Sequence, residues 1–303
     1  MKLKLFLSFT LVLLIMPHVW AGDNFELLHG REAHNKGDYR QAAGRYSKDA
    51  EQGDASAQYN LGVLYANGQG VPQDDEQAVY WYRKAAEQGD VSAQSNLGSM
   101  YATGRGVSQD DKQAVSWYLK AAEQGDASAQ NNLGSMYHAG KGIPQDDKQA
   151  LIWYSKSAEQ GYAPAQSNLG DMYQYARGVP RDKKQAMAWY LKAAKQGVVR
   201  AQLLVGLLYD EGKAPQDKKQ AVVWFCKAAE RGNADAQLVL GQMYVEGKGV
   251  PQDDMQAYAW YSVAASKGNQ TAMENRETLR MTANQAKRAR ALAREYLEKY
   301  GKI

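Results

Sequence analysis

The sequence predicts an all-α solenoid built from helix pairs, and three observations point to it. First, one stretch of the 303-residue chain, 57–89, returns in nearly the same form along the sequence. Its first alanine recurs at a spacing of 36 residues four times and then 35, at Ala57, Ala93, Ala129, Ala165, Ala201 and Ala236. Second, apolar residues within each copy recur at helical spacing. Third, a single cysteine leaves no internal disulfide, so stability must come from packed helices. A fixed period of this size is typical of arrays in which each repeat contacts its neighbours.

Residues 1–21 have the features of a secretory signal. Lys2 and Lys4 precede an apolar run over 5–16, which is too short to span a bilayer core of about 30 Å. Val19 and Ala21 provide the small residues that precede a cleavage site. We therefore expect cleavage after Ala21 and a periplasmic or secreted mature chain, the alternative being an uncleaved anchor.

Residues 22–56 predict a first helix pair without the long loop of the later copies. A turn at 37–39 separates two helical segments. Ala42 and Tyr46 lie one turn apart and stand 36 residues before Ala78 and Tyr82 of the first full copy. This N-terminal pair resembles a tetratricopeptide unit.

The first full copy shows how each repeat is predicted to fold. In its first helix, Leu61, Leu64 and Tyr65 form a core stripe. Gly62 recurs in every copy although glycine inside a helix costs up to about 1 kcal/mol relative to alanine. We therefore expect Gly62 to let a neighbouring helix approach closely.

A loop and a second helix complete the copy. Gly68 and Gly70 are predicted to end the first helix, because glycine adopts positive φ without strain. Asp74 is a predicted N-cap, with Gln77 as its capping-box partner. The second helix is expected to bury Ala78, Trp81, Tyr82 and Ala85.

These residues resemble the Sel1-like repeat. The pattern A-x-A-Q-x-N-L-G-x-M-Y-x-x-G-x-G-V-x-Q-D-x-x-Q-A-x-x-W-Y-x-K-A-A-E-Q-G covers about 57–271 in six copies. The resemblance implies a right-handed α/α superhelix of antiparallel helix pairs that binds proteins. Two departures concern loop shape: Ala176 replaces a loop glycine in copy four, and the loop at 213–215 in copy five is one residue short.

Residues 272–303 leave the pattern and predict a capping helix. Thr282 and Gln285 form a capping box. The expected buried face comprises Ala286, Ala289, Ala293, Tyr296 and Leu297. The segment 276–303 carries a net charge of +5, which predicts either a basic contact face or a solvated helix face.

Catalytic and metal-binding patterns are scarce. Without the signal, the net charge of +2 does not favour nucleic-acid binding. The paired aspartates are explained as helix caps, and His29, His34 and His138 lack metal-ligand spacing. Cys226 stands in a variable position, so we interpret it as an unspecialised thiol rather than a redox group. We expect a non-enzymatic protein with no cofactor and no metal.

Variation between the copies indicates where a partner binds. The third, seventh and tenth positions of the first helix, counted from the recurring alanine, vary and are expected to form an exposed stripe. By resemblance this helix lines a concave groove that holds a protein or extended peptide. The predicted groove residues, including the recurring asparagines at the fourth position, are Tyr59, Asn60, Val63, Asn96, Ser99, Asn131, Asn132, Ser135, His138, Asn168, Asp171, Gln174, Leu203 and Leu207.

Several alternatives stay open. The asparagines either bind a peptide backbone or bond to the preceding repeat, and the leucines of copy five either anchor an apolar side chain or pack. The resemblance implies an adaptor, expected as a monomer, that engages envelope or host proteins. Other Sel1-like proteins bind or hydrolyse β-lactams, but they carry paired cysteines that this chain lacks. A peptidoglycan-associated assembly factor is a further alternative.

Overall fold

The computed structural model describes residues 23–212 and 215–301, and the regular structure within these residues is helical. The predicted signal segment 1–21 lies outside the described residues. The helix bounds are α1 Asp23–Asn35, α2 Tyr39–Glu51, α3 Ala55–Asn67, α4 Asp75–Glu87, α5 Val91–Thr103, α6 Asp111–Glu123, α7 Ala127–Ala139, α8 Asp147–Glu159, α9 Ala163–Gln174, α10 Lys183–Lys195, α11 Val199–Asp210, α12 Pro215–Glu230, α13 Ala234–Glu246, α14 Asp254–Ser266, α15 Gln270–Thr278 and α16 Ala283–Tyr300.

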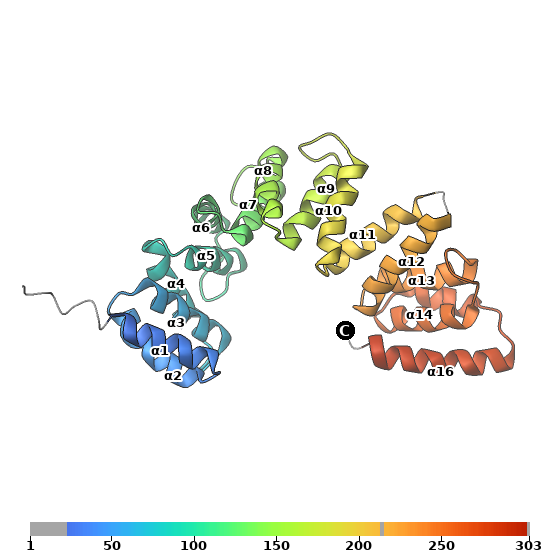
Figure 1. Cartoon of the computed structure of the whole chain (residues 1–303), viewed down its shortest axis with the longest axis horizontal. Helices are drawn as coiled ribbons and strands as arrows, with labels where there is room; N and C mark the ends of the chain where they lie inside the picture. The colour runs from blue at the N-terminus through green and yellow to red at the C-terminus, as the bar shows by residue number, and fades with distance from the viewer. Residues whose placement is uncertain (1–22, 213–214, 302–303) are drawn as a thin grey trace, which may run out of the picture. The chain divides into compact units, whose positions relative to one another are not determined.

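Consecutive helices pack in pairs, which confirms the predicted all-α solenoid of helix pairs. The chain divides into two compact units after Lys120, and each is described by itself. In the first unit α1 packs on α2 and α3 on α4, and in the second unit the pairs run from α7/α8 to α13/α14 (Figure 1). The second helix of one pair also packs on the first helix of the next, as α2 does on α3 and α8 on α9.

The glycine inside the first helix of each pair lies against an aromatic ring. A Cβ atom on Gly62 would stand 2.8 Å from the ring of Tyr82 in the second helix of the same pair. The same contact recurs in the N-terminal pair, where Gly30 meets Tyr46. The prediction of close helix approach at Gly62 is confirmed, because no side chain fits between the helix and the ring.

The glutamine that follows the recurring alanine joins successive repeats. Gln58 is 3% exposed, and its side-chain amide donates to the Ala50 carbonyl oxygen in the preceding pair at 3.0 Å. Equivalent bonds to the preceding pair are made by Gln94, Gln130, Gln166, Gln202 and Gln237. A buried amide needs such a partner, so this glutamine recurs for a structural reason.

The Asp74 cap forms only half of the predicted capping box. Its carboxylate accepts a bond from the Gln77 backbone N–H at 3.0 Å. The backbone N–H of Asp74 already donates to the Tyr65 carbonyl oxygen at 3.0 Å, and this bond closes the loop. The N–H is therefore not available to the Gln77 side chain. Both halves are present at Thr282 and Gln285, as predicted.

The two loop glycines have different roles, which corrects one prediction. Gly68 ends α3 in the left-handed conformation, with φ 66°. Gly70 does not end the helix but lies on the preceding pair, where a Cβ atom would stand 2.2 Å from the Tyr39 carbonyl. One copy later Gly106 would place a Cβ atom 2.1 Å from the Asp75 carbonyl oxygen, so the loop touches the preceding helix directly.

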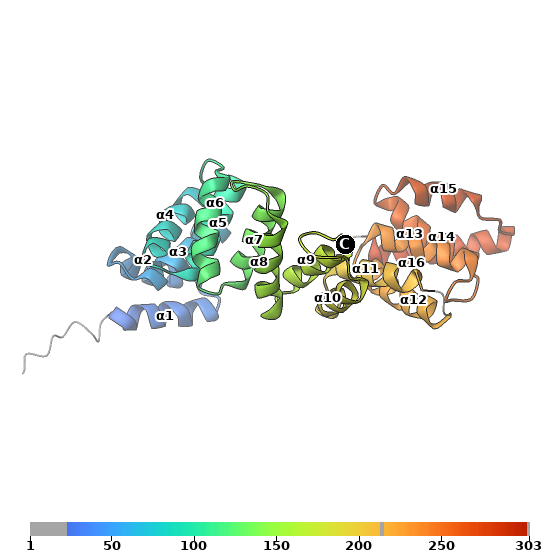
Figure 2. The same ribbon diagram turned by 90° about the horizontal axis from the view of Figure 1, so that it is seen from above.

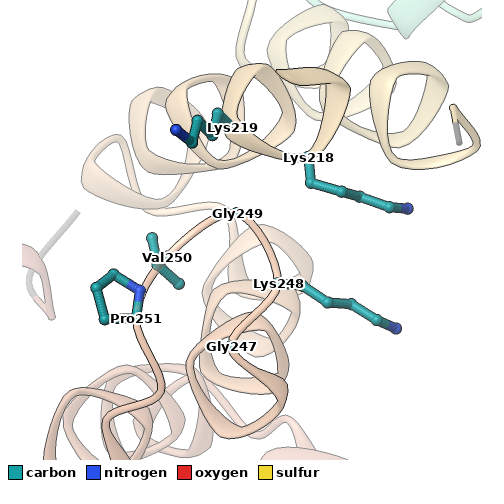
Figure 3. Close-up of a pocket in the computed structure, with 7 residues that line it drawn as sticks. All are labelled: Lys218, Lys219, Gly247, Lys248, Gly249, Val250 and Pro251. Carbon is teal, nitrogen blue, oxygen red and sulfur yellow. The ribbon is translucent and has the colours of Figure 1, made fainter. Parts of the chain in front are cut away.

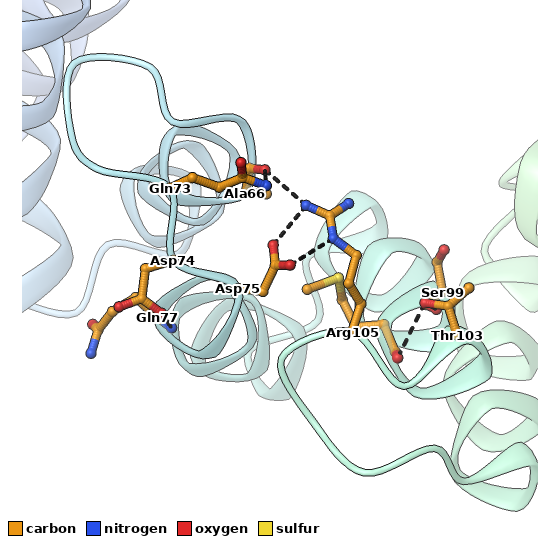
Figure 4. A network of polar contacts seen from close by, with 9 residues as sticks. Ala66, Gln73, Asp74, Asp75, Gln77, Ser99, Thr103 and Arg105 are labelled. Carbon is orange, nitrogen blue, oxygen red and sulfur yellow. Dashed lines mark hydrogen bonds and ion pairs between the residues drawn. The ribbon is translucent and has the colours of Figure 1, made fainter.

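An ion pair reinforces this loop contact in the first unit. Arg105 binds the Asp75 carboxylate through two nitrogens, at 2.8 and 2.6 Å, and donates to the Ala66 carbonyl at 2.8 Å (Figure 4). The Arg105 hydrogen bond lowers the pKa of Asp75 below its ordinary value. The loop of one copy therefore clamps both helices of the preceding copy.

The C-terminal helices continue the array before closing it. In α15, Asn269 caps the helix and Ala272 is fully buried, as in the preceding copies. Helix α16 then packs on α14, with Ala289 and Ala293 buried as predicted, and α14, α15 and α16 lie together in Figure 2. Trp260 of α14 has ring-centroid distances of 4.8 Å to Tyr296 and 5.3 Å to Tyr300.

Candidate functional site

The third position of the first helix, counted from the recurring alanine, faces inward in three copies. Ser95, Asn131 and Ser167 are 9%, 7% and 4% exposed, so the prediction that this position is exposed was wrong for them. Helical periodicity identified a face that varies, but a face can vary and still lie against the next repeat. Leu203 is likewise partly buried against the core that contains Phe225 and Leu240.

In α5 and in copy five, the exposed line instead passes through the residue before the recurring alanine, the seventh position and the eleventh. In α5 these are Ser92, Ser99 and Thr103, and all three are exposed. In the second unit, the corresponding exposed residues of copies four and five are Pro164, Tyr175, Arg200, Leu207 and Glu211. The spacing of seven and four residues keeps them on one helix face.

Two of the four recurring asparagines, Asn96 and Asn168, bond to the preceding repeat. The Asn96 side chain hydrogen-bonds to the Tyr82 hydroxyl, whose pKa burial raises to about 12. Asn168 donates to the Asn131 side-chain oxygen at 2.9 Å. In α15 the equivalent Asn275 bonds to Tyr261, whose pKa burial also raises to about 12. Asn96 and Asn168 therefore make the inter-repeat bond, which is one of the two roles left open by the sequence.

Between copies five and six, both partners of this bond are replaced together. Phe225 takes the place of the tyrosine, and Val239, fourteen residues later, takes the place of the asparagine. Phe225 is fully buried and Val239 packs against its cluster. A lone asparagine facing a phenylalanine would leave a buried amide unpaired. One repeat earlier, Leu204 replaces the asparagine although Tyr190 is kept, and the Tyr190 hydroxyl donates to Asp171 instead.

In copies three and four, the seventh position of the first helix carries a polar side chain. This side chain hydrogen-bonds to the tyrosine of the second helix in the same pair. Ser135 lies 3.0 Å from the Tyr154 hydroxyl, and Tyr190 donates to the Asp171 carboxylate at 2.6 Å. Arg200, from α11 in the next repeat, pairs with the other Asp171 oxygen at 2.7 Å. Burial, with the Asp171 carboxylate beside it, raises the pKa of Tyr190 above its ordinary value.

Copies four and five also present large apolar side chains on the exposed line. Tyr175 is 53% exposed and Leu207 is 39% exposed. Tyr175 lies close enough to Arg200 and Tyr190 to interact with both electrostatically. Tyr175 therefore lies beside the Asp171–Arg200 ion pair, and Leu207 follows Arg200 by seven residues on the same face of α11. The pattern of variable positions identified Leu207 but missed Tyr175 and Arg200.

The family comparison agrees with this repeat geometry. The model of the Sel1 repeat matches six segments of the chain, at 55–90, 91–126, 127–162, 163–198, 199–233 and 234–269. The chain belongs to the Sel1 repeat family. The comparison with curated proteins found no significant match.

Two solved structures show the same Sel1 repeat fold. A Sel1 repeat protein from Oxalobacter formigenes is 40% identical with a TM-score of 0.73, over 85% of this chain and 76% of that one. A protective antigen of uropathogenic Escherichia coli strains that displays an SLR fold is 29% identical with a TM-score of 0.54, over 92% of this chain and 85% of that one.

His138 of the third Sel1 repeat sits in a chain of polar contacts. Its Nδ1 lies 2.6 Å from the Asp147 carboxylate, and its Nε2 lies 3.0 Å from a guanidinium nitrogen of Arg177. An aspartate–histidine pair can serve as a base when the second ring nitrogen is open to substrate. Here that nitrogen faces Arg177, so the arrangement favours an inter-repeat contact.

The other predicted groove residues are distributed between surface and core. Val63 packs partly buried against the core that contains Tyr82. Gln174 has a buried side-chain oxygen without a hydrogen-bond partner. The remaining predicted residues Tyr59, Asn60 and Asn132 are half-buried. This geometry does not test whether a partner binds along the predicted row, so the groove stays a prediction.

A pocket lies between the fifth and sixth Sel1 repeats, at the loop of the sixth. It has a volume of about 610 Å³ between the start of α12 and the loop 247–251. Lys218 and Lys248 extend side by side there, and Lys219 points elsewhere (Figure 3). Lys218 is paired with Asp210 at 2.8 Å, and Lys248 with Glu246, so the pocket is not an open cationic site.

Cys226 is the single thiol of the chain. Burial raises the pKa of the Cys226 thiol to about 11, which disfavours the reactive thiolate at neutral pH. Within residues 23–212 and 215–301, no three His, Cys, Asp or Glu side chains form a set that could hold a metal ion. None of the helices in that part of the chain is long and apolar enough to cross a membrane.

Proposed function

We propose that this Sel1 repeat protein is a non-enzymatic scaffold that binds an extended segment of a protein partner. The segment lies along the exposed line of α9 and α11. The observation that carries the proposal is the pair of exposed apolar side chains, Tyr175 at the C-cap of α9 and Leu207 on α11, the first helices of consecutive repeats. Exposed aromatic and aliphatic side chains beside a fixed ion pair are typical anchors of protein interfaces.

The recurring asparagines remain candidates for a secondary role in this binding. Asn168 uses one donor for Asn131, and an amide offers two donors and one acceptor oxygen. Its half-buried side chain can therefore keep its inter-repeat bond and still accept from a peptide N–H. We place the primary contact at Tyr175 and Leu207, because much of their apolar surface is open to solvent and gains most from being covered.

Peptide selection followed by calorimetry tests the proposal. Peptides are selected from a random library on the purified protein, and their affinities are measured for Tyr175→Ala and Leu207→Ala. Each substitution is expected to weaken binding about tenfold or more, as is usual for interface anchors. Ile152→Ala is the matched control, because Ile152 is 45% exposed on α8, the second helix of its pair. Loss of affinity with Ile152→Ala, and none with Leu207→Ala, would contradict the proposed surface.

We also propose that the scaffold is exported, on the basis of the charged start and apolar run within residues 1–21. Expression in a Gram-negative host, fractionation and mass spectrometry of the N-terminus test this. The expected result is a periplasmic or secreted chain that starts at Gly22. A cytoplasmic chain that retains Met1 would contradict it.

A further inference from the structure

Three arginines converge on a pocket at the C-terminal end of the second unit. Arg276 comes from α15, and Arg290 and Arg294 stand one turn apart on α16. The pocket has a volume of about 290 Å³, and its apolar part is formed by Tyr258 and Leu297. Three of the basic residues that give segment 276–303 its net charge of +5 thus surround one cavity.

The three guanidinium groups have no acidic partner in the described part of the chain. No residue that lines the pocket is acidic, and none of the three arginines makes an ion pair or hydrogen bond there. Arg276 lies over the Tyr258 ring, 5.8 Å from its centroid. Elsewhere arginines bind carboxylates, as Arg105 does Asp75 and Arg200 does Asp171. Unpaired like charges around one cavity repel one another, and an anion between them would remove that repulsion.

The geometry points to a site for a phosphate monoester with an apolar or aromatic body. A guanidinium donates in a planar fork that matches phosphate oxygens. A phosphate monoester carries about −1.5 to −2 charges at pH 7, so it compensates three cations better than one carboxylate does. Tyr258 and Leu297 offer the surface for the apolar body. Ser262 is not a ligand, because it is 5% exposed and donates to the Tyr258 carbonyl at 2.8 Å.

Calorimetric titration of the purified protein with phenyl phosphate tests the site. We expect saturable binding that Arg290→Gln and Arg294→Gln each weaken about tenfold, the effect of losing one charge-assisted hydrogen bond. Arg276→Lys should weaken binding as well, because lysine keeps the charge but loses the fork. Arg288→Gln is the matched control: it removes the same charge from α16 at an exposed residue outside the pocket, and should leave affinity unchanged.

Further titrations separate the sources of the phosphate group and the ways in which the inference fails. Binding of phenyl phosphate but not of vesicles that contain phosphatidic acid would identify a soluble ligand, and arginine-dependent binding of these vesicles would identify a lipid headgroup. The inference is overturned if phenyl phosphate does not bind, if phenylacetate binds equally tightly, or if Arg288→Gln weakens binding as much as Arg294→Gln. Circular dichroism melting of each variant excludes loss of fold as the cause.

Discussion

Ala176 holds a backbone conformation that glycine holds in the equivalent loops. Its φ of 57° is left-handed, and it is the only non-glycine residue with positive φ in the described ranges. The sequence marked this residue as a departure from the repeat, with loop shape in question. The structure shows that the loop keeps the left-handed turn although α9 has only 12 residues. The strain of this conformation falls on Ala176.

Ala176→Gly is therefore expected to stabilise the protein. A non-glycine residue in this conformation costs about 1–2 kcal/mol. Glycine's greater freedom in the unfolded chain offsets about 0.4–1 kcal/mol of that. The net gain of about 0.5–1 kcal/mol should appear in urea unfolding. Gly140→Ala, the same position one copy earlier with φ 65°, should change stability in the opposite direction.

Arg231 leaves a buried acceptor unpaired. In the preceding copy, Gln196 donates to both the Gly161 carbonyl and the Gln166 side-chain oxygen, at 3.0 and 2.9 Å. Arg231 replaces that glutamine and donates to the Gly197 carbonyl at 2.8 Å. The side-chain oxygen of Gln202 then has no partner.

Arg231→Gln is expected to restore the missing bond and raise stability by about 1 kcal/mol. Thermal melting measures the change. Arg231→Ala, which loses the bond to Gly197 and gains none, should lower stability. Equal melting of the glutamine variant and the parent would show that the Gln202 oxygen finds another partner in solution.

Each loop acts as an element that binds the preceding helix pair. Gly106 has no room for a Cβ atom, whereas a Cβ atom on Gly89, with φ 95°, would meet no atom within 4 Å. Both substitutions to alanine carry the cost of positive φ, but only Gly106→Ala also overlaps a backbone. We expect Gly106→Ala to cost about 1–3 kcal/mol more than Gly89→Ala in denaturant unfolding. Equal losses would mean that the loop can move away from α4.

The Asp75–Arg105 pair should make the same contact depend on pH. Arg105 lowers the pKa of Asp75, so the pair stabilises the fold above the ordinary pKa of an aspartate and loses this effect as pH falls through the lowered value. A double-mutant cycle with Asp75→Asn and Arg105→Gln should give a coupling of about 0.2–1 kcal/mol at pH 7. The coupling should vanish in strong acid, and a coupling that persists there would exclude the charge on Asp75 as its origin.

At the scale of the whole molecule, consecutive helix pairs pack on one another within each of the two units, so stability is expected to be distributed repeat by repeat. After the last Sel1 pair, α15 and α16 both pack on α14. In the first full copy Lys84 covers Trp81, but in copy six a buried valine, Val263, replaces that lysine, and Tyr300 stacks on Trp260.

Tyr300→Ala is expected to destabilise the last repeat by about 3 kcal/mol, the usual cost of deleting a buried aromatic ring. Hydrogen exchange followed by mass spectrometry should show faster exchange over 234–300 and no change over 55–120. An equal increase in both segments would indicate that the chain unfolds as one cooperative unit.

The sequence by itself determined the repeat, its core and its caps. Leu61, Gly62 and Tyr82 recur because each pair must bury the same surface, and recurrence is visible in one chain. Only the tertiary structure decided that Asn96 bonds to Tyr82, that Asn131 faces inward, and that Tyr175 is exposed beside Arg200. Helical periodicity assigns residues to faces of one helix, whereas the partner that covers each face is contributed by another repeat. The exposed line at Tyr175 and Leu207 and the arginine pocket on α16 therefore became visible once the helices were packed.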